Sequence, residues 1–345
     1  MAAGESEFGG TERFEIIRRL GAGGMGVVYE ARDRQHDRRV ALKTVLRLPG
    51  QELERLRAEF RALQGLRHQN LVALEELHEE GGCCFYTMEL VEGTSFVRWV
   101  RPPAPGRDEG VLDELRLRAA LGQLCRGLLA LHEAGRVHRD IKPSNILVTA
   151  AGRVVLLDFG LATVLTGGAD QSLPGQPGGT VEYMAPEQAA AAYVGTEADW
   201  YGVGVVLYEA LTGSLPFSGA PLEVMANKQQ VDPPPPHVLW PAVPQDLDAL
   251  CVDLLRFDPS ARPRGRRVLA RLGVALPGDG EDPSSTSSHA QVFVGREREL
   301  GVLRRSFADV RRGAAVTVLV HGEAGVGKTT LGRRLAADLL AAAEP

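Results

Sequence analysis

The sequence predicts an α+β fold of two lobes, followed by a separate and incomplete α/β unit. Strand-like alternation dominates residues 13–90, where five short strands and one main helix are expected. From residue 94 to residue 272 the spacing of apolar residues becomes mostly helical. A stretch rich in Pro, Gly, Ser and acidic residues then precedes a new helix-and-strand pattern over 292–345.

Composition favours a globular protein without an excess of positive charge. The chain has 345 residues, of which 44% are hydrophobic and 24% charged, and its formal net charge is −5. These values exclude a fully disordered chain and lack the basic excess of nucleic-acid binders, so no direct nucleic-acid contact is expected. There is no run of about 18 apolar residues and no secretory signal, which argues against a membrane protein. Four cysteines without CxxC spacing fit reduced thiols and predict a cytoplasmic location.

Lysine is rare in this chain. It has four lysines against 35 arginines. A lysine kept in such a background indicates a position that the broad, planar guanidinium cannot fill, although four residues are a small sample. Three of the four, Lys43, Lys142 and Lys328, lie in motifs that handle phosphate, and the fourth is Lys228.

The first lobe follows from short-range patterning. Residues 1–12 predict a flexible leader, and three strands separated by glycine-rich or charged turns are expected within 14–45. Residues 51–66 carry apolar side chains at helical spacing and predict a helix. Two more strands are expected around 71–77 and 83–90. Together these elements predict an antiparallel sheet with one helix.

The second lobe is predicted to be mainly helical. Helices are expected over 96–100, 112–134, 199–211, 245–256 and 264–272, with short strands and loops over 137–160. Residues 163–176 are polar and glycine-rich, which predicts a mobile loop. The tract 231–244 contains six prolines and is expected to be extended, because Pro cannot continue a helix. Residues 273–291 predict a flexible linker.

A glycine-rich turn and a lysine form the first candidate site. Gly21, Gly23 and Gly26 give a GxGxxG pattern between two predicted strands. Backbone N–H groups of such a turn can approach phosphates because no Cβ intervenes, although an ordinary flexible turn has the same pattern. Lys43 lies on the next strand, where its ammonium could hold phosphates or face solvent. Glu59, on the helix 51–66, could orient Lys43 or be one of several exposed acids.

A second group of polar residues fits the chemistry of phosphoryl transfer. This reaction needs a group that orients the incoming hydroxyl, oxygen ligands for Mg²⁺ and cations near the phosphates. Asp140 can orient a hydroxyl, Lys142 can approach the γ-phosphate, and Asn145 and Asp158 offer oxygens to Mg²⁺. Any one of them alone would be an ordinary cap or surface group. Their order and spacing predict an enzyme that transfers phosphate.

The ordered motifs resemble the signature set of eukaryotic-type protein kinases, most closely the bacterial serine/threonine kinases. In order they read GAGGMGVV, VALK, HRDIKPSN, DFG, GTVEYMAPE and DWYGVG, and the similarity extends over about 14–272. The resemblance implies a protein kinase domain over 13–272, with lobes at 13–90 and 94–272. It also implies ATP and Mg²⁺ as cofactors, serine and threonine hydroxyls of proteins as substrates, and a dimer that would support autophosphorylation.

The resemblance also implies roles for single residues. The catalytic group would be Asp140, Lys142, Lys43, Glu59 and Thr180, and the magnesium ligands would be Asn145 and Asp158. Lys43 would pair with Glu59 in the active state. The nucleotide would lie against Leu20, Gly21, Ala22, Gly23, Gly24, Met25, Gly26, Val28, Ala41, Lys43, Met88, Glu89, Val91 and Leu147.

Three further expectations follow from the same resemblance. Glu187 and Arg262 would form a buried ion pair, and Asp199 would support the catalytic loop. Activation-loop phosphorylation would fall on Thr163, Thr166 or Ser172, and the sequence does not choose among them.

The last segment carries a phosphate-binding motif of a different kind. Residues 322–329 (GEAGVGKT) match GxxxxGK[ST], with a predicted strand over 314–320 before them and a helix after them. Backbone N–H groups between Gly322 and Gly327 would wrap phosphates, Lys328 would reach the β- and γ-phosphates, and Thr329 would bind Mg²⁺. Residues 293–300 resemble the entry segment of AAA/STAND-type ATPases. We therefore expect residues 292–345 to be the N-terminal part of a truncated P-loop NTPase domain.

Two classes of function remain open at this point. The first is a serine/threonine protein kinase in a signalling role. The alternative is an ATP-binding pseudokinase or scaffold that regulates a fused P-loop ATPase or transcriptional regulator. The presence of Lys43, Asp140, Asn145 and Asp158 favours the enzyme.

Overall fold

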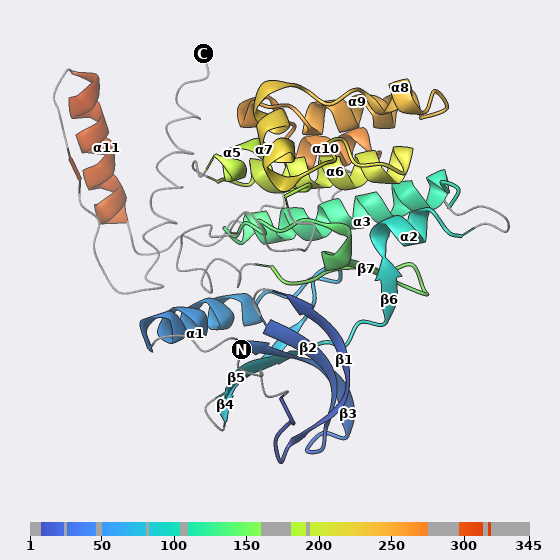
Figure 1. Ribbon diagram of the computed structural model, residues 1–345. Coiled ribbons are helices and arrows are strands. Elements are labelled where there is room, and N and C mark those ends of the chain that lie inside the picture. Colours follow the sequence, from blue (N-terminus) through green and yellow to red (C-terminus); the bar gives the residue numbers. More distant parts are fainter. Residues whose placement is uncertain are drawn as a thin grey trace, which may run out of the picture. The chain divides into compact units, whose positions relative to one another are not determined.

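The computed structural model describes residues 8–23, 26–45, 50–80, 83–103, 110–159, 181–190, 194–274, 297–312 and 317–318. The chain divides into two compact units, Met1–Pro277 and Gly278–Pro345. The first unit contains both sheets and most of the described helices (Figure 1). The finer predicted boundaries, 13–272 for the lobes and 273–291 for the linker, stay predictions.

A five-stranded antiparallel sheet forms the small lobe of the first unit (Figure 1). Its spatial order is β1-β2-β3-β5-β4, because the hairpin of the last two strands joins the sheet through β5. The strands are β1 (Phe14–Gly23), β2 (Gly26–Asp33), β3 (Arg38–Val45), β4 (Leu74–Glu80) and β5 (Cys83–Met88). The five strands expected from the sequence are confirmed.

One helix, α1 (Gly50–Gln64), accompanies this sheet and confirms the helix expected over 51–66. Leu56, Phe60 and Leu63 are at most 2% exposed. Their spacing of four and three residues places them on one helix face. That face packs into the core, and Glu59, half-buried at the border of the same face, can meet a cation there.

The large lobe is helical, as expected, with one small sheet (Figure 1). Its helices are α2 (Phe96–Val100), α3 (Glu114–Glu133), α5 (Pro186–Ala189), α6 (Glu197–Thr212), α7 (Pro221–Gln230), α8 (Pro236–Leu239), α9 (Gln245–Leu254) and α10 (Gly265–Arg271). Two 3₁₀ turns, η1 (Pro143–Asn145) and η2 (Pro259–Ala261), and the strands β6 (Gly93–Ser95), β7 (Ile146–Thr149) and β8 (Val154–Leu156) complete it.

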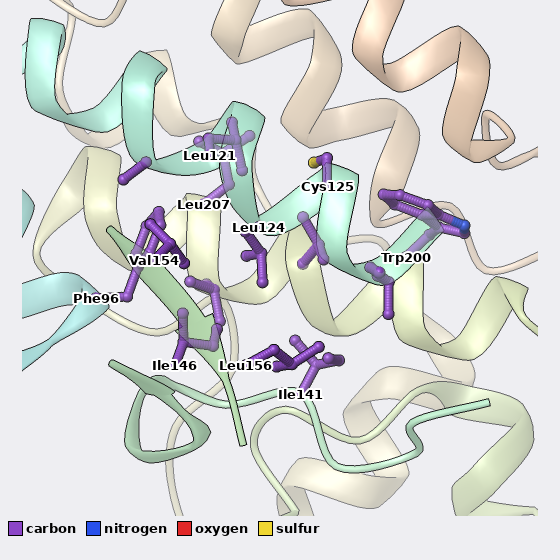
Figure 2. Close-up of a cluster of buried hydrophobic side chains, with 14 of the residues drawn as sticks. Phe96, Leu121, Leu124, Cys125, Ile141, Ile146, Val154, Leu156, Trp200 and Leu207 are labelled. Atoms are coloured by element: carbon purple, nitrogen blue, oxygen red, sulfur yellow. The ribbon is translucent and has the colours of Figure 1, made fainter. Parts of the chain in front are cut away.

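The core of this lobe joins α3, α6 and the small sheet. Figure 2 shows its buried side chains, which include Phe96, Leu121, Leu124, Cys125, Ile141, Ile146, Val154, Leu156, Trp200 and Leu207. The helix α6 is buried along most of its length, which agrees with its very apolar sequence. Ile141, in the loop that carries the candidate catalytic residues, is part of this core, and it anchors the loop to it.

One prediction for this lobe is wrong, and several elements, among them the helix α5, were missed. The tract 231–244 is not extended throughout, because residues 236–239 form the short helix α8. Pro236 is the first residue of that helix, where its missing N–H costs no hydrogen bond and its fixed φ suits the helix. The helix α7 and the three-residue strand β6 were not expected from the sequence.

The two lobes are joined by a backbone bridge that precedes β4. Leu71 pairs in parallel with Leu156 of β8, and the amide of Val72 donates to the carbonyl of Leu156 (3.0 Å). The side chain of Asn70 donates to the carbonyl of Val154 (2.8 Å). The small-lobe sheet is thus tied to the strand that leads into Asp158.

The second unit shows one described helix, α11 (Glu297–Arg311), where a helix was expected. The strand expected over 314–320 lies mostly outside the described residues, and the glycine-rich loop and the following helix lie wholly outside them. In the part of the chain that the structure describes, none of the helices has the length and apolar character needed to cross a bilayer.

Candidate active site

Three of the candidate catalytic residues meet on the loop before β7. The side-chain amide of Asn145 donates to the backbone carbonyl of Asp140 (2.8 Å) and to its carboxylate Oδ2 (2.9 Å). The ammonium of Lys142 lies 2.8 Å from the same Oδ2. The 3₁₀ turn η1, which Pro143 begins, brings Asn145 back towards Asp140. The loop therefore presents a carboxylate, a cation and an amide within hydrogen-bond distance of one another.

A buried carboxylate on α6 fixes the backbone of this loop. Asp199 is 1% exposed and accepts hydrogen bonds from the amides of His138 (2.8 Å) and Arg139 (2.6 Å). Arg139 has a φ of 69°, which a non-glycine residue rarely adopts without support. The expectation that Asp199 supports the catalytic loop is confirmed.

His138 connects the loop to the strand that carries the metal-ligand candidate. Its Nε2 donates to the carbonyl of Leu157 (2.8 Å), and its Nδ1 accepts from the amide of Asp140 (3.2 Å). A carbonyl can only accept and an amide can only donate, so the ring proton resides on Nε2. One imidazole therefore contacts the backbone of Asp140 and that of Leu157, the residue before Asp158.

The charge pairs of the site differ from those expected. Lys43, 7% exposed on β3, pairs with Asp158 (2.8 Å). Glu59 on α1 pairs with Arg136, just before the catalytic loop. The Lys43–Glu59 pair expected in the active state is thus not formed, because each of the two residues has another opposite charge beside it. The structure holds the arrangement in which the lysine is joined to the metal-ligand candidate.

The glycine-rich turn has one glycine that the fold requires and one that opens to space. Gly26 has a φ of 140°, and a Cβ there would lie 1.8 Å from the carbonyl oxygen of Thr44. No atom lies within 4 Å of the Cβ position at Gly21. Gly26 is therefore demanded by the packing of β2 on β3, while Gly21 leaves room that a ligand could use.

Three of the residues expected to contact a purine, Ala41, Met88 and Glu89, lie together where β3 pairs with the end of β5. Ala41 and Met88 are opposite each other in the pairing of β3 with β5, and both are at most 5% exposed. The amide of Glu89 donates to the carbonyl of Ala73 (2.9 Å), so its backbone can offer a base only the carbonyl oxygen. The carboxylate of Glu89 is held by Arg153. This stretch is therefore ordered before any ligand binds.

The remaining side chains expected to contact the nucleotide are less buried. Val28 pairs with Lys43 across β2 and β3, and Leu147 pairs with Val155 across β7 and β8. Val28, Val91 and Leu147 are half-buried, whereas Leu20 is 40% exposed and Ala22 is also exposed. They come from both lobes, so a ligand between them would contact both.

An open groove of about 540 Å³ lies beside Lys142 and was not predicted. Arg98 of α2, Ser144 of the catalytic loop, Tyr183 and Glu209 of α6 are among its lining residues. The hydroxyl of Tyr183 donates to Glu209 (2.7 Å), and burial raises the pKa of the Glu209 carboxyl above its usual value. No single sequence motif predicts this groove, since its residues come from five separate segments.

The expected ion pair between Glu187 and Arg262 is present. Two nitrogens of the guanidinium contact the two carboxylate oxygens at 2.6 and 2.9 Å, and the Arg262 side chain is fully buried. Arg262 also donates to the carbonyls of Arg256, Glu197 and Phe257. This one side chain therefore ties together separate segments of the large lobe.

Several predicted site residues lie outside the described residues. They are Gly24, Met25, Thr163, Thr166, Ser172, Thr180, Gly322, Gly327, Lys328 and Thr329.

Comparison with protein families gives two matches that follow one another along the chain. Residues 14–271 match the family model of the protein kinase domain. Residues 292–344 match that of the AAA ATPase domain. The first match covers well over half of the chain.

Several serine/threonine-protein kinases are similar to this chain. The chain is 36% identical to serine/threonine-protein kinase Pkn1 of Myxococcus xanthus, over 72% of this chain and 36% of that protein. It is 37% identical to PknA of Mycobacterium tuberculosis (73% and 58%) and 33% identical to PrkC of Bacillus subtilis (72% and 38%). The chain thus spans between about a third and somewhat over half of the length of these relatives.

A solved structure of the same architecture is a mutant of the PknI kinase domain of Mycobacterium tuberculosis. The TM-score is 0.59 at 23% identity, and the match covers 78% of this chain and 98% of that one. The two-lobed fold expected from the sequence is confirmed.

Proposed function

Because the chain belongs to the protein kinase family, we propose that it transfers the γ-phosphate of ATP to serine and threonine hydroxyls of proteins, including its own, in a signalling role. The observation that carries the proposal is the meeting of Asp140, Lys142 and Asn145 on one loop, opposite the Lys43–Asp158 pair that bridges the lobes. Phosphoryl transfer requires this combination of a carboxylate, cations and oxygen ligands.

In this proposal Asp140 orients the substrate hydroxyl. Lys142 and Asn145 both contact its Oδ2. The substrate hydroxyl would therefore donate its hydrogen bond to the other carboxylate oxygen, Oδ1. Lys142, beside it, would place a positive charge where the transferred phosphoryl group carries negative charge. The fixed backbone at Asp199 keeps both side chains in register with the incoming hydroxyl.

The donor atoms at the site fit a hard divalent cation, in line with the Mg²⁺ that such enzymes generally use. The amide nitrogen of Asn145 is turned to Asp140, so its oxygen is the atom left for a metal, and Asp158 supplies a carboxylate. A bound Mg²⁺ would neutralise phosphate charge. Within the described ranges no group of three or more His, Cys, Asp or Glu side chains could hold a metal ion by itself, and phosphate oxygens and water would complete the coordination.

The charge pairs of the structure indicate a resting arrangement. In this proposal the ion pair between Lys43 and Asp158 breaks when Lys43 contacts the nucleotide phosphates. The ion pair between Glu59 and Arg136 also breaks, so that Glu59 can pair with Lys43. Both exchanges replace one ion pair with another, so the two arrangements can be close in free energy.

Two further points belong to the proposal. The segment 292–344 would hold a second nucleotide through Gly322, Gly327, Lys328 and Thr329, as its similarity to AAA ATPase domains supports. The reaction would take place in the cytoplasm, where ATP is available and the four cysteines stay reduced.

The test is incubation of the whole chain with Mg²⁺ and ATP radiolabelled at the γ-phosphate. The variants are Asp140→Asn, which removes the carboxylate charge with little change of shape, and Asp246→Asn, a matched exposed control on α9. We expect serine or threonine to be labelled in the native chain and in the control but not in Asp140→Asn. Mass spectrometry of the product would choose among Thr163, Thr166 and Ser172.

A different result would overturn the catalytic proposal. If neither the native chain nor the control transfers label to protein, while ATP still raises the melting temperature, the chain binds nucleotide without transferring phosphate. It would then be an ATP-binding scaffold for the fused ATPase segment.

A further inference from the structure

Lys228, the lysine outside the phosphate motifs, is buried against backbone. It lies on α7 and is 2% exposed. Its ammonium donates to the carbonyls of Val181 (2.9 Å), Glu182 (2.6 Å) and Met184 (2.7 Å). Three carbonyls of one short segment thus converge on a single nitrogen.

This geometry suits lysine and not arginine. An ammonium has three donors arranged around one atom, and all three are used here. A guanidinium is planar and spreads its donors over three nitrogens, so it cannot reproduce the contact. In a chain with 35 arginines and four lysines, an amine at this position has a specific structural reason.

The surroundings of Lys228 contribute little opposite charge. Within the described ranges it forms no salt bridge with a carboxylate; Glu182 favours the charged form from a distance, and the ring of Tyr201 lies 5.4 Å from the ammonium. The guanidinium of Arg262, which pairs with Glu187, lies 4.9 Å from the centre of the same ring. Backbone carbonyls are therefore the main partners of this cation.

The segment that Lys228 holds forms a wall of the groove beside the catalytic loop. Tyr183 lines the groove together with Lys142, whose ammonium contacts Asp140. The same segment is tied at its far end, because Gln229 donates to the carbonyl of Pro186 (2.7 Å) and Gln188 to that of Arg139 (3.0 Å). Residues 181–188 are therefore held by hydrogen bonds both to α7 and to the catalytic loop.

We propose that Lys228 is a positioning residue for the protein substrate. Through three carbonyls it sets the shape of residues 181–184, and this places Tyr183 in the wall of the groove where the chain flanking the reacting hydroxyl lies. The inference rests on the proposed function, since it assumes that the groove beside Lys142 receives the substrate polypeptide. Lys228 itself contacts neither the substrate nor the nucleotide. Its loss should therefore impair peptide binding and leave the nucleotide site intact.

The experiment compares the native chain with Lys228→Met, Lys228→Arg and the control Gln230→Met, an exposed residue on the same helix. The substrate is a serine/threonine peptide selected from a synthetic library by the native chain. We expect both Lys228 variants to raise the KM for this peptide about tenfold or more, since up to three charge-assisted hydrogen bonds are lost. The KM for ATP and the rise of the melting temperature with ATP should stay at the native values.

A second readout keeps the inference testable if Lys228→Met folds poorly. In Lys228→Arg, which keeps the charge, amide hydrogen exchange should accelerate within residues 181–188 and stay unchanged in α3 and α6. A purely structural role would instead lower the melting temperature and kcat without changing the peptide KM, and that result would overturn the inference. Full rescue by Lys228→Arg would overturn it as well, because charge alone would then suffice.

The two proposals fail in different ways. If the native chain labels a peptide but the Lys228 variants bind that peptide normally, only the inference about Lys228 is wrong. If the native chain labels no peptide in the library and no protein, the proposed function is wrong, and the inference fails with it.

Discussion

At the scale of single residues, the state of the site depends on which cation holds Glu59. Both Glu59 and Arg136 are about 30% exposed, so their ion pair is only partly shielded from water. Such pairs contribute roughly 0.2–1 kcal/mol. An interaction of this size is large enough to shift a balance between two arrangements and small enough to be reversed by a ligand.

We predict that Arg136→Met raises the basal rate of phosphoryl transfer, because Glu59 then becomes available to Lys43. The strength of a half-exposed ion pair corresponds to a gain of about two- to fivefold. Initial rates at saturating ATP measure the effect. The control is Arg57→Met on α1, where the ion pairs with Glu54 and Glu79 have no link to the site. A gain that persists when Glu59→Gln is added would contradict the explanation.

A second prediction at this scale concerns pH. Below about pH 7 Lys228 is the ammonium with three donors, and above it a neutral amine with two, because burial lowers its pKa from 10.5 to about 7. Between these values the unfolded chain binds a proton that the folded chain does not, so this group makes the free energy of unfolding rise with pH. The slope contributed by one such proton is at most about 1.4 kcal/mol per pH unit.

Denaturant unfolding of the native chain and of Lys228→Met at several pH values between 7 and 10 checks this. The difference in unfolding free energy between the two proteins should change with pH in the direction that favours the native chain at higher pH. A difference that stays constant over this range would show that Lys228 keeps its proton when the protein folds.

At the scale of elements, α6 is the helix around which the large lobe is organised. It supplies Asp199 to the catalytic loop and Glu209 to the groove, and two glycines let neighbours approach it closely. A Cβ at Gly202 would lie 2.8 Å from the Cβ of Ile141, and one at Gly204 would lie 2.9 Å from that of Leu254. Such contacts are closer than packed atoms tolerate.

We predict that Gly204→Ala destabilises the first unit by about 1–3 kcal/mol, although alanine is the better helix former, because the added methyl group forces α6 and α9 apart. Calorimetry measures the change. Gly65→Ala is the matched control, since no atom lies within 4 Å of the Cβ position there. A neutral or stabilising effect at Gly204 would mean that the helices can separate without cost.

The elements also show how far the sequence alone leads. The helix α6 was expected because its apolar run is long, and the catalytic loop was expected because its motif is compact. The helix α7 was missed because residues 221–230 bury only Val224 and Lys228, which is too little for an apolar period. The short helix α8 was missed because proline was taken only as a breaker. The partner of Glu59 could not be predicted, since it depends on the state of the site and not on spacing.

At the scale of the whole molecule, the chain divides where the sequence turns polar. The two compact units meet at Pro277 and Gly278, within the stretch that was expected to be a linker. All the candidate catalytic residues that the structure describes belong to the first unit, as do both sheets. The first unit therefore contains its own core and its own site.

We predict that residues 1–277 alone unfold in one cooperative transition and transfer phosphate to the selected peptide at a rate within about twofold of the whole chain, because an independent core supports the site. Scanning calorimetry and the peptide assay check this. A loss of activity without a loss of stability would show that residues 278–345 regulate the first unit.

The bridge between Leu71 and Leu156 is one of the links that limit a rotation of the lobes. It joins them beside β4, which is one edge of the five-stranded sheet, while β1, which ends at Gly23, is the other edge. In a rotation about this point, displacement grows with the length of the lever arm. Asp158 follows Leu156 by two residues and would scarcely be displaced, whereas Gly21 and Gly23, at the end of β1, would move farther. Opening of the lobes would thus release the phosphates from one side only.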